Sequence, residues 1–267
     1  MNKKTSFFEK FYLLFVFIFL YAPIAVLIFY SFNQSRILGV WSGFSLKWYQ
    51  RLFEDRAILN AVNTTLLVGV IATIVSTIVG TFAAVGISEF SKNKRRIILG
   101  INDIPVLNPD IVIAISLMVL YGMLKIPKGL LTLILSHIAF TIPYVVLSVL
   151  PKIKQMDKNL IDAALDLGAT PIQALIKVVI PEIKPGIIAG AMMAFTLSID
   201  DFVISFFTVS PGLNTIATTV FSMTKRGIEP TINALSTLMF VAVLILLIIV
   251  NILQNKNMKK NKEKIDR

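Results

Sequence analysis

Six long apolar stretches, separated by polar segments, dominate the hydrophobic pattern of this 267-residue chain. At a rise of about 1.5 Å per residue, a helix of roughly 20 residues crosses the 30 Å of hydrocarbon in a bilayer. The stretches lack the polar–apolar alternation of barrel strands, so the pattern predicts an all-α integral membrane protein. The six predicted transmembrane helices cover residues 11–31, 64–88, 101–124, 129–150, 187–208 and 233–253.

Composition agrees with this prediction and excludes several other classes of protein. Hydrophobic residues make up 56% of the chain and charged residues only 15%, well below the roughly 25% of soluble domains. A soluble enzyme, a disordered chain and a coiled coil are thereby excluded. Cysteine is absent, and neither a P-loop nor a catalytic motif of the GxSxG or HExxH type occurs. We therefore expect no enzyme activity, no cofactor and no metal site.

The distribution of basic residues predicts how the chain lies in the membrane. The formal net charge is +11, and the basic residues gather at the ends of the apolar stretches, which favours lipid headgroups over nucleic acid as a partner. With six spans, 18 of the 26 Lys and Arg residues fall on the side of the termini. The positive-inside rule then predicts that both termini are cytoplasmic. The first stretch lacks a small-residue cleavage site, so we expect an uncleaved span.

The chain is expected to divide into three parts. Residues 1–59 form an N-terminal span with an external loop, residues 60–253 a transmembrane domain, and residues 254–267 a basic cytoplasmic tail. In the external loop, Trp48 and Leu52 are four residues apart. This spacing suits a short amphipathic helix at the membrane interface, and a loop with scattered aromatic residues is the alternative.

The loop between the fourth and fifth spans, residues 151–186, is too long for a simple linker. Its first apolar residues have helical i, i+3, i+4, i+7 spacing, and Gly168 is placed to end that helix. Thr170 is placed to cap a second amphipathic helix that begins at Pro171 and should end before Pro181. The loop is predicted to present two short helices to the cytoplasm. The apolar residues of the two helices are Leu160, Ala163, Ala164 and Leu167, then Ile172, Leu175, Ile176 and Val179.

This loop resembles the EAA loop of bacterial ABC-importer permeases. Asp162, Ala163 and Ala164 match its Glu-Ala-Ala element, Gly168 its glycine, and residues 178–181 its Ile-x-Leu-Pro element, which ends here in Ile180 and Pro181. Asp for Glu, Val for Ile and Ile for Leu are mild departures. The resemblance implies that these six residues couple the chain to an ATP-hydrolysing subunit. An ordinary amphipathic hairpin is the alternative.

Three further segments are similar to the C-type permease subunit of spermidine/putrescine importers. They are NPDIVIAISL at 108–117, LSHIAFTIPYVV at 135–146 and AFTLSIDDFVISFF at 194–207. The resemblance implies a multi-pass protein of the bacterial cytoplasmic membrane. It also implies three partners: a dimer of ATP-binding subunits, a second permease subunit and an extracytoplasmic polyamine-binding protein.

Four acidic residues, Asp103, Asp110, Asp200 and Asp201, lie inside the predicted spans, which hold no Lys or Arg. An Asp near the bilayer centre costs about 2.5–3.5 kcal/mol on insertion scales, so such residues usually mark a transport path. A helix-end Asp held by a hydrogen bond is the alternative, and Asp103, nearest the cytoplasmic edge, fits it best. Asp103 and Asp110, seven residues apart, should share a helix face that Tyr121 continues. The adjacent carboxylates of Asp200 and Asp201 favour a polyvalent cation as cargo and disfavour anions.

Other residues of the spans have one functional and one structural interpretation each. Tyr121 and Phe202 belong to a set of aromatic residues that either line a cation–π path or pack against lipid and other helices. His137, the only histidine, is expected to form an interhelical hydrogen bond, with a proton relay as the alternative. Small residues recur every four positions in the fifth span and predict close helix contact, namely Gly186, Gly190, Ala194 and Ser198.

The sequence thus favours a permease subunit of an ATP-driven importer for polyamines. A proton-coupled secondary transporter that uses the buried Asp residues and His137 is the main alternative, although it would not need the 151–186 loop. An ABC permease for another small cationic solute also remains open. A membrane enzyme is disfavoured, because no constellation of nucleophile, base and metal ligands occurs.

Overall fold

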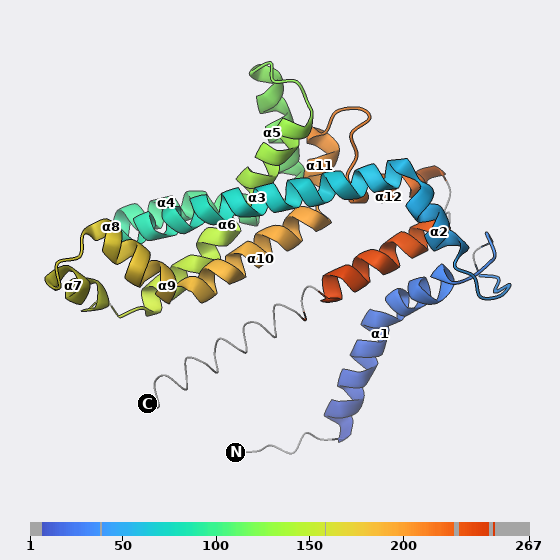
Figure 1. Ribbon diagram of the computed structural model, residues 1–267, viewed down its shortest axis with the longest axis horizontal. Helices are drawn as coiled ribbons and strands as arrows, with labels where there is room; N and C mark the ends of the chain where they lie inside the picture. Colours follow the sequence, from blue (N-terminus) through green and yellow to red (C-terminus); the bar gives the residue numbers. More distant parts are fainter. Residues whose placement is uncertain (1–6, 38, 158, 227–229, 246–247, 249–267) are drawn as a thin grey trace. The chain divides into compact units, whose positions relative to one another are not determined.

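The protein is helical, as the hydrophobic pattern predicts. The computed structural model describes residues 7–37, 39–157, 159–226, 230–245 and 248 (Figure 1). Within these ranges the one β feature is an isolated antiparallel bridge between Asn33 and Phe44. The predicted all-α fold is confirmed.

The helices differ widely in length, and one short segment is a π-helix, η1. In chain order they are α1 (Phe7–Ser31), α2 (Lys47–Glu54), α3 (Arg56–Glu89), α4 (Lys92–Leu107), α5 (Asp110–Met123), α6 (Leu130–Gln155), α7 (Asn159–Asp166), α8 (Pro171–Ala174), η1 (Leu175–Val179), α9 (Ile180–Glu182), α10 (Lys184–Asp200), α11 (Val203–Thr208), α12 (Ile216–Arg226) and an unlabelled helix, Pro230–Ile245.

Three of these helices, α1, α3 and α6, are long and apolar enough to cross a membrane alone. Two further pairs of consecutive helices, each pair bent at a break, are long and apolar enough only when the two members are taken together: α4 with α5, and the Pro171–Glu182 segment with α10. The described residues therefore hold up to five spans if each pair counts as one. The sixth predicted stretch, 233–253, overlaps helix Pro230–Ile245, and part of it lies outside the described residues. The count of six stays a prediction.

The third predicted stretch is two helices rather than one. Asn108 is extended (φ −83°, ψ 147°) and Pro109 precedes α5, so the axes of α4 and α5 are bent by 103°. Pro109 explains the interruption, because proline lacks an N–H and forces the preceding residue out of the α region. The expectation that Asp103 and Asp110 share a helix face is wrong, because the bend places them on different helices.

The fifth predicted stretch, 187–208, is also interrupted. α10 ends at Asp200, and α11 begins only after Asp201 (φ −65°, ψ 123°) and Phe202. The Asp201 carboxylate accepts hydrogen bonds from the backbone N–H groups of Ile204 and Ser205, the second and third residues of α11. An Asp that bonds to nearby backbone in this way competes with helix continuation. The expectation of one continuous helix is wrong for this reason.

The described chain forms two compact units. One contains the described parts of residues 1–59 and 220–267, and the other contains residues 60–219. In the first unit, residues 47–54 are helical, so the predicted short helix is confirmed, and its place at an external membrane interface stays a prediction. Its Trp48 and Leu52 are buried in the chain. The predicted division at residues 59 and 253 stays a prediction.

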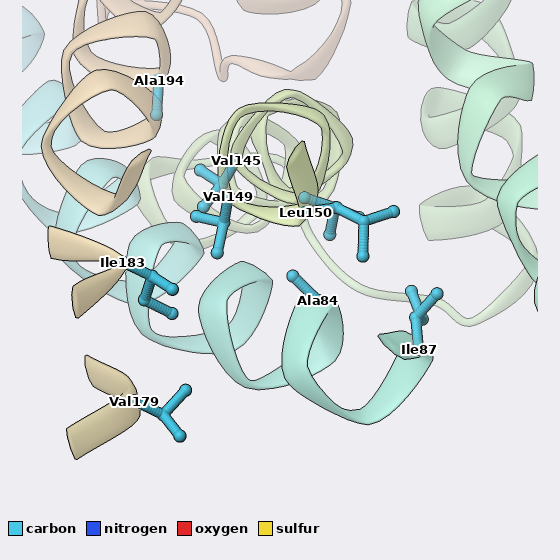
Figure 2. Packing of buried hydrophobic residues seen from close by; sticks show 9 residues of the cluster. Ala84, Ile87, Val145, Val149, Leu150, Val179, Ile183 and Ala194 are labelled. Carbon is cyan, nitrogen blue, oxygen red and sulfur yellow. The ribbon is translucent and has the colours of Figure 1, made fainter. Parts of the chain in front are cut away.

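Helix α6 is the centre of the 60–219 unit. Figure 2 shows α6 end-on, with Val145 and Val149 close to side chains of α3 and α10. These residues belong to one buried apolar cluster, which consists of Ala84, Ile87, Val145, Val146, Val149, Leu150, Val179, Ile183 and Ala194. Three helices and the end of the 151–186 loop thus share one core.

Small residues let the helices of this core approach one another closely. A Cβ added at Gly80 of α3 would lie 2.7 Å from the Cβ of Val145, and one at Gly190 would lie 3.2 Å from the Cα of Val145. The residues of α10 that are buried are the four predicted from their spacing: Gly186, Gly190, Ala194 and Ser198. The expectation of close helix contact along this stripe is confirmed.

We expect Gly80→Ala to destabilise the 60–219 unit, because the new methyl group would collide with Val145. Overpacking of this kind typically costs about 1–3 kcal/mol. The measurement is the thermal unfolding midpoint of the purified chain in detergent.

Gly86→Ala on the same helix is the matched control, since a Cβ there meets nothing within 4 Å. It should leave the midpoint unchanged or raise it slightly, because Ala is the better helix former. If Gly80→Ala melts as late as Gly86→Ala, the close contact between α3 and α6 does not limit stability.

Candidate functional site

The first candidate site is the 151–186 loop, which includes the last residues of α6 (151–155) and the first residues of α10 (184–186). It folds into α7 and then a second helical segment made of α8, η1 and α9. In Figure 1 these helices lie together at one end of the 60–219 unit. The two predicted loop helices are therefore present.

Gly168 makes the turn after α7. Its φ is +83°, in the left-handed region that favours glycine. The Gly168 N–H donates to the carbonyl of Leu165 (2.9 Å), and the Ala169 N–H donates to that of Ala164 (3.1 Å). This pair of hydrogen bonds is a Schellman motif. The prediction that Gly168 ends the first helix is confirmed.

Thr170 begins the second helical segment. Its hydroxyl accepts a hydrogen bond from the backbone N–H of Gln173 (3.3 Å), and the Gln173 side chain accepts one from the Thr170 N–H (3.0 Å). This reciprocal arrangement is a capping box, with Pro171 at the first helical position. The predicted cap is confirmed. The turn between the two helices is therefore fixed by Gly168 on one side and by Thr170 on the other.

The second helical segment was expected to end before Pro181, and this expectation is wrong. It passes through the π-helix η1 and Pro181 to Glu182, then bends by 70° into α10. In a regular α-helix the Pro181 ring would clash with the carbonyl of Lys177. In η1 the Ile180 N–H instead donates to the Leu175 carbonyl, five residues back. The wider turn just before Pro181 explains how the helix continues through it.

The loop presents apolar side chains at its surface. Leu167 beside Gly168 is 90% exposed. On the other side of the second segment, Ala174, Val179 and Ile183 are buried, and the last two belong to the core around α6. Of the predicted coupling residues, Asp162, Ala163, Gly168 and Pro181 are exposed, and Ala164 and Ile180 are half-buried. The other exposed large apolar residues are Leu160, Leu165, Ile172 and Ile176. The second helical segment therefore packs on the core with one side, while the loop as a whole has several exposed apolar side chains at its surface.

The second candidate site is a buried polar network at the break between α10 and α11. The Asp201 carboxylate accepts hydrogen bonds from the Ile204 N–H (3.1 Å), the Ser205 N–H (2.8 Å) and the Ser205 hydroxyl (2.9 Å). Its Oδ2 also lies 3.5 Å from Nε2 of His137 on α6. Asp201 therefore fits the structural interpretation, in which an Asp at a helix end is held by hydrogen bonds.

His137 joins this network from α6. Its Nδ1 lies 2.6 Å from the Ser198 hydroxyl and its Nε2 3.1 Å from the Ser205 hydroxyl. Because the Ser205 hydroxyl donates its only proton to Asp201, Nε2 must carry the proton of the bond to Ser205. In the neutral ring, Nδ1 then accepts from Ser198. The expected interhelical hydrogen bond of His137 is confirmed, and it reaches both α10 and α11.

The other predicted acidic residues do not join this network. Asp200 and Asp110 are exposed, at the last residue of α10 and the first of α5. Asp103 is half-buried on α4, where it accepts a hydrogen bond from the neighbouring Asn102 side chain (3.3 Å). Of the four carboxylates, only Asp201 is hydrogen-bonded to another helix within the described part of the chain.

The two predicted aromatic residues lie in different surroundings. Tyr121 on α5 is buried, and its hydroxyl is hydrogen-bonded to that of Ser136 on α6 (2.9 Å). Phe202 is half-buried, with its ring 5.5 Å from that of Phe206. Ser136 and Ser205 were not singled out from the sequence, and Ser198 was predicted only as a small residue of the contact stripe, although hydroxyl side chains within apolar spans are a recognisable signal for interhelical hydrogen bonds.

We expect Asp201→Ala to lower the thermal unfolding midpoint and Asp200→Ala to leave it nearly unchanged. The first change removes the cap of α11, which is typically worth about 0.5–2 kcal/mol, and leaves the Ser205 hydroxyl without its acceptor. Asp200 is exposed and accepts no hydrogen bond within the described residues, so it is a matched control one position away. Equal midpoints for the two variants would show that the network adds little stability.

Comparison with known proteins identifies the family. The family described as "Binding-protein-dependent transport system inner membrane component" matches residues 76–260. The putrescine transport system permease protein PotI of Escherichia coli K12 is 38% identical over 243 residues, which cover 86% of this chain and 85% of that protein. The spermidine/putrescine transport system permease protein PotC of the same strain is 35% identical over 246 residues, covering 92% and 93%.

The fold also agrees with that of solved transporters. A bacterial ABC transporter involved in the import of the acidic polysaccharide alginate has a chain that matches with a TM-score of 0.69, 19% identity and 89% coverage of both chains. This likeness supports the fold alone. The resemblance of the chain to the permease family is confirmed. The relatives are named as membrane components of transport systems, which agrees with the expectation that the chain is not an enzyme. The chain therefore belongs to the family of inner membrane components of binding-protein-dependent transport systems, the permease subunits of ABC transporters.

Proposed function

We propose that this permease serves an ATP-driven importer of polyamines and forms part of the translocation pathway for them. The observation that carries the proposal is the similarity, over most of the chain, to permeases named for putrescine and for spermidine/putrescine transport. The acidic residues in its predicted spans, which hold no Lys or Arg, suit a cargo with several positive charges.

The proposal includes three partners: a dimer of ATP-binding subunits, a second permease subunit and an extracytoplasmic polyamine-binding protein. The family description itself names dependence on a binding protein. The sequence holds no P-loop, so ATP hydrolysis would take place on a separate subunit. One matching structure is a bacterial alginate ABC transporter in complex with a periplasmic protein.

We further propose that both termini and the 151–186 loop face the cytoplasm. The excess of Lys and Arg on that side, 18 of 26 residues, supports this orientation. The loop would then face the compartment that holds ATP. Its outer face of exposed apolar side chains, together with Asp162 and the turn at Gly168, would dock on the ATP-binding subunit, and Ile180 and Pro181 would connect the docked surface to α10.

The docking proposal predicts that Gly168→Val impairs uptake and ATPase coupling. A β-branched residue at positive φ costs roughly 1–2 kcal/mol, which would shift the turn that orients α7. The measurements are uptake in cells and cargo-stimulated ATP hydrolysis by the reconstituted complex, with membrane insertion checked by immunoblot.

Gly168→Asn is the matched control, because Asn tolerates the left-handed region and a Cβ at this position meets nothing within 4 Å. It should retain most of the coupling. Normal coupling in Gly168→Val would remove the loop from the proposed mechanism.

For the cargo path we propose the residues selected from the sequence: Asp110, Asp200, Asp201, Asp103, Tyr121 and Phe202. Their surroundings suggest different roles. Asp110 and Asp200 are exposed and can offer their charge to a passing cation. The carboxylate of Asp201 is committed to α11 and His137, so it would act mainly by fixing the break beside Asp200. Tyr121 would support the path through its bond to Ser136.

The proposal predicts that Asp110→Asn and Asp200→Asn slow the uptake of labelled putrescine or spermidine while thermal stability stays at the parental level. Asn keeps the size of the side chain and removes its charge. Asp103→Asn should have a smaller effect, because that residue is half-buried beside Asn102. The measurement is the initial rate of uptake by the importer expressed with its partner subunits.

Competition by unlabelled solutes tests the cargo itself. Excess putrescine or spermidine should abolish the signal, whereas a monovalent amine should not. Parental uptake rates in both Asn variants would show that these carboxylates do not serve the path. Absence of any polyamine uptake by the assembled complex would refute the proposed cargo.

A further inference from the structure

The segment between α1 and α2 folds back onto the end of α1. The Gln34 N–H donates to the carbonyl of Gly43 (2.9 Å), and the Ser45 N–H donates to that of Phe32 (2.7 Å). We call residues 33–37 and 39–46 the interface hairpin. The side chain of Asn33 closes it: its Oδ1 accepts from the Ser42 N–H (3.0 Å), and its Nδ2 donates to the Val40 carbonyl (2.7 Å).

This fold holds two aromatic rings of the interface hairpin beside the end of α1. Trp41 stacks on Phe29, which lies in the last turns of α1, with the ring centroids 4.4 Å apart. Phe44 stacks on Phe32, immediately after α1, with a separation of 5.4 Å. Since α1 is long and apolar enough to cross a membrane, its end marks the boundary between hydrocarbon and water. Trp41 and Phe44 therefore lie beside the end of a helix that is long and apolar enough to span a membrane.

The same two rings are open to the surroundings. Trp41 is 43% exposed and Phe44 is 70% exposed, and Phe29 of α1, on which Trp41 stacks, is exposed too. Trp48, the only other tryptophan, is 1% exposed, and its indole N–H donates to the carbonyl of Asn33 (2.6 Å). The chain thus uses one tryptophan as internal support for the interface hairpin and leaves the other on an apolar surface continuous with that of a spanning helix.

α1 has a particular need for such a surface. None of the residues in its most apolar 18-residue window is buried by the described part of this chain. The depth and tilt of a spanning helix are set either by packing on neighbouring helices or by anchoring residues at the interface. Tryptophan and other aromatic side chains are the usual anchors, and basic side chains at the same level bind anionic headgroups. Arg36 and Lys47, both exposed, flank the two rings in sequence.

We propose that the interface hairpin is a lipid anchor, in which Trp41 and Phe44 lie in the headgroup layer of the bilayer and set the depth of α1. This role is independent of the cargo and of the ATP-binding partner. Its surface fits a bilayer with anionic lipid, because an apolar aromatic centre is flanked by basic side chains.

Two single-tryptophan variants of the full chain test the proposal in vesicles of phosphatidylcholine and phosphatidylglycerol. Trp48→Phe leaves Trp41, and Trp41→Phe leaves Trp48. Lipids brominated near the headgroup end of the acyl chain should quench Trp41 strongly and lipids brominated near the methyl end weakly, while aqueous iodide should quench it little. Trp48 should respond weakly to all three quenchers.

Strong quenching of Trp41 by iodide, with no response to brominated lipid, would overturn the proposal. The same holds if Trp41 is shielded only after an extracytoplasmic binding protein is added, since the surface would then serve protein docking.

A second measurement does not depend on replacing the buried Trp48. The chain has no cysteine, so Phe44→Cys accepts a single nitroxide label, and Gln50→Cys on the exposed polar side of α2 is its control. The label at position 44 should collide more with oxygen, which is enriched in the membrane, than with a water-soluble nickel complex. The label at position 50 should show the opposite preference. Equal access of the nickel complex to both labels would refute the anchor.

Discussion

The close approach of α6 to α3 and α10 is the constraint on which the 60–219 unit depends. Val145 of α6 meets Gly80 from one side and Gly190 from the other, at separations that leave no room for a Cβ of either glycine without displacement. In a bilayer, lipid tails are as apolar as leucine, so helices associate through dense packing and interhelical hydrogen bonds rather than through exclusion of water. Large side chains at either glycine would separate the helices, and the polar groups that connect them would lose their partners.

The polar network beside this contact follows from it. His137 can reach Ser198 and Ser205 because the small residues of α10 bring the two helices together. The network in turn stabilises the end of α10, where Asp201 turns the chain into α11. Packing, hydrogen bonding and the helix break are therefore parts of one arrangement, and the exposed Asp200 lies at its edge.

Helix ends marked by turn and cap residues could be predicted from the sequence, whereas breaks inside apolar stretches and contacts between distant residues could not. Gly168 and Thr170 were predicted correctly because helix caps involve residues only a few positions apart. The break at Asp201 was missed although its hydrogen bonds to the start of α11 are local, because Asp201 lies inside an apolar stretch long enough for one span and its other partner, His137, is far away in sequence. Pro181 suggested a helix end, since a π turn has no clear sequence signal. Among the candidate site residues, the sequence identified Asp201 and His137 as unusual but could not assign Ser198 and Ser205 as their hydrogen-bond partners.

The sequence separation within the polar network bears on how the chain is made. His137 precedes Ser198 by 61 residues and Ser205 by 68. During synthesis α6 therefore leaves the ribosome well before either serine exists, and its imidazole has neither of them as a partner until α10 and α11 follow. An unpaired polar group in hydrocarbon is costly, so the newly made α6 gains stability when the later helices arrive. The order in which the helices are synthesised thus gives α10 and α11 a polar site on α6 that is ready to receive them.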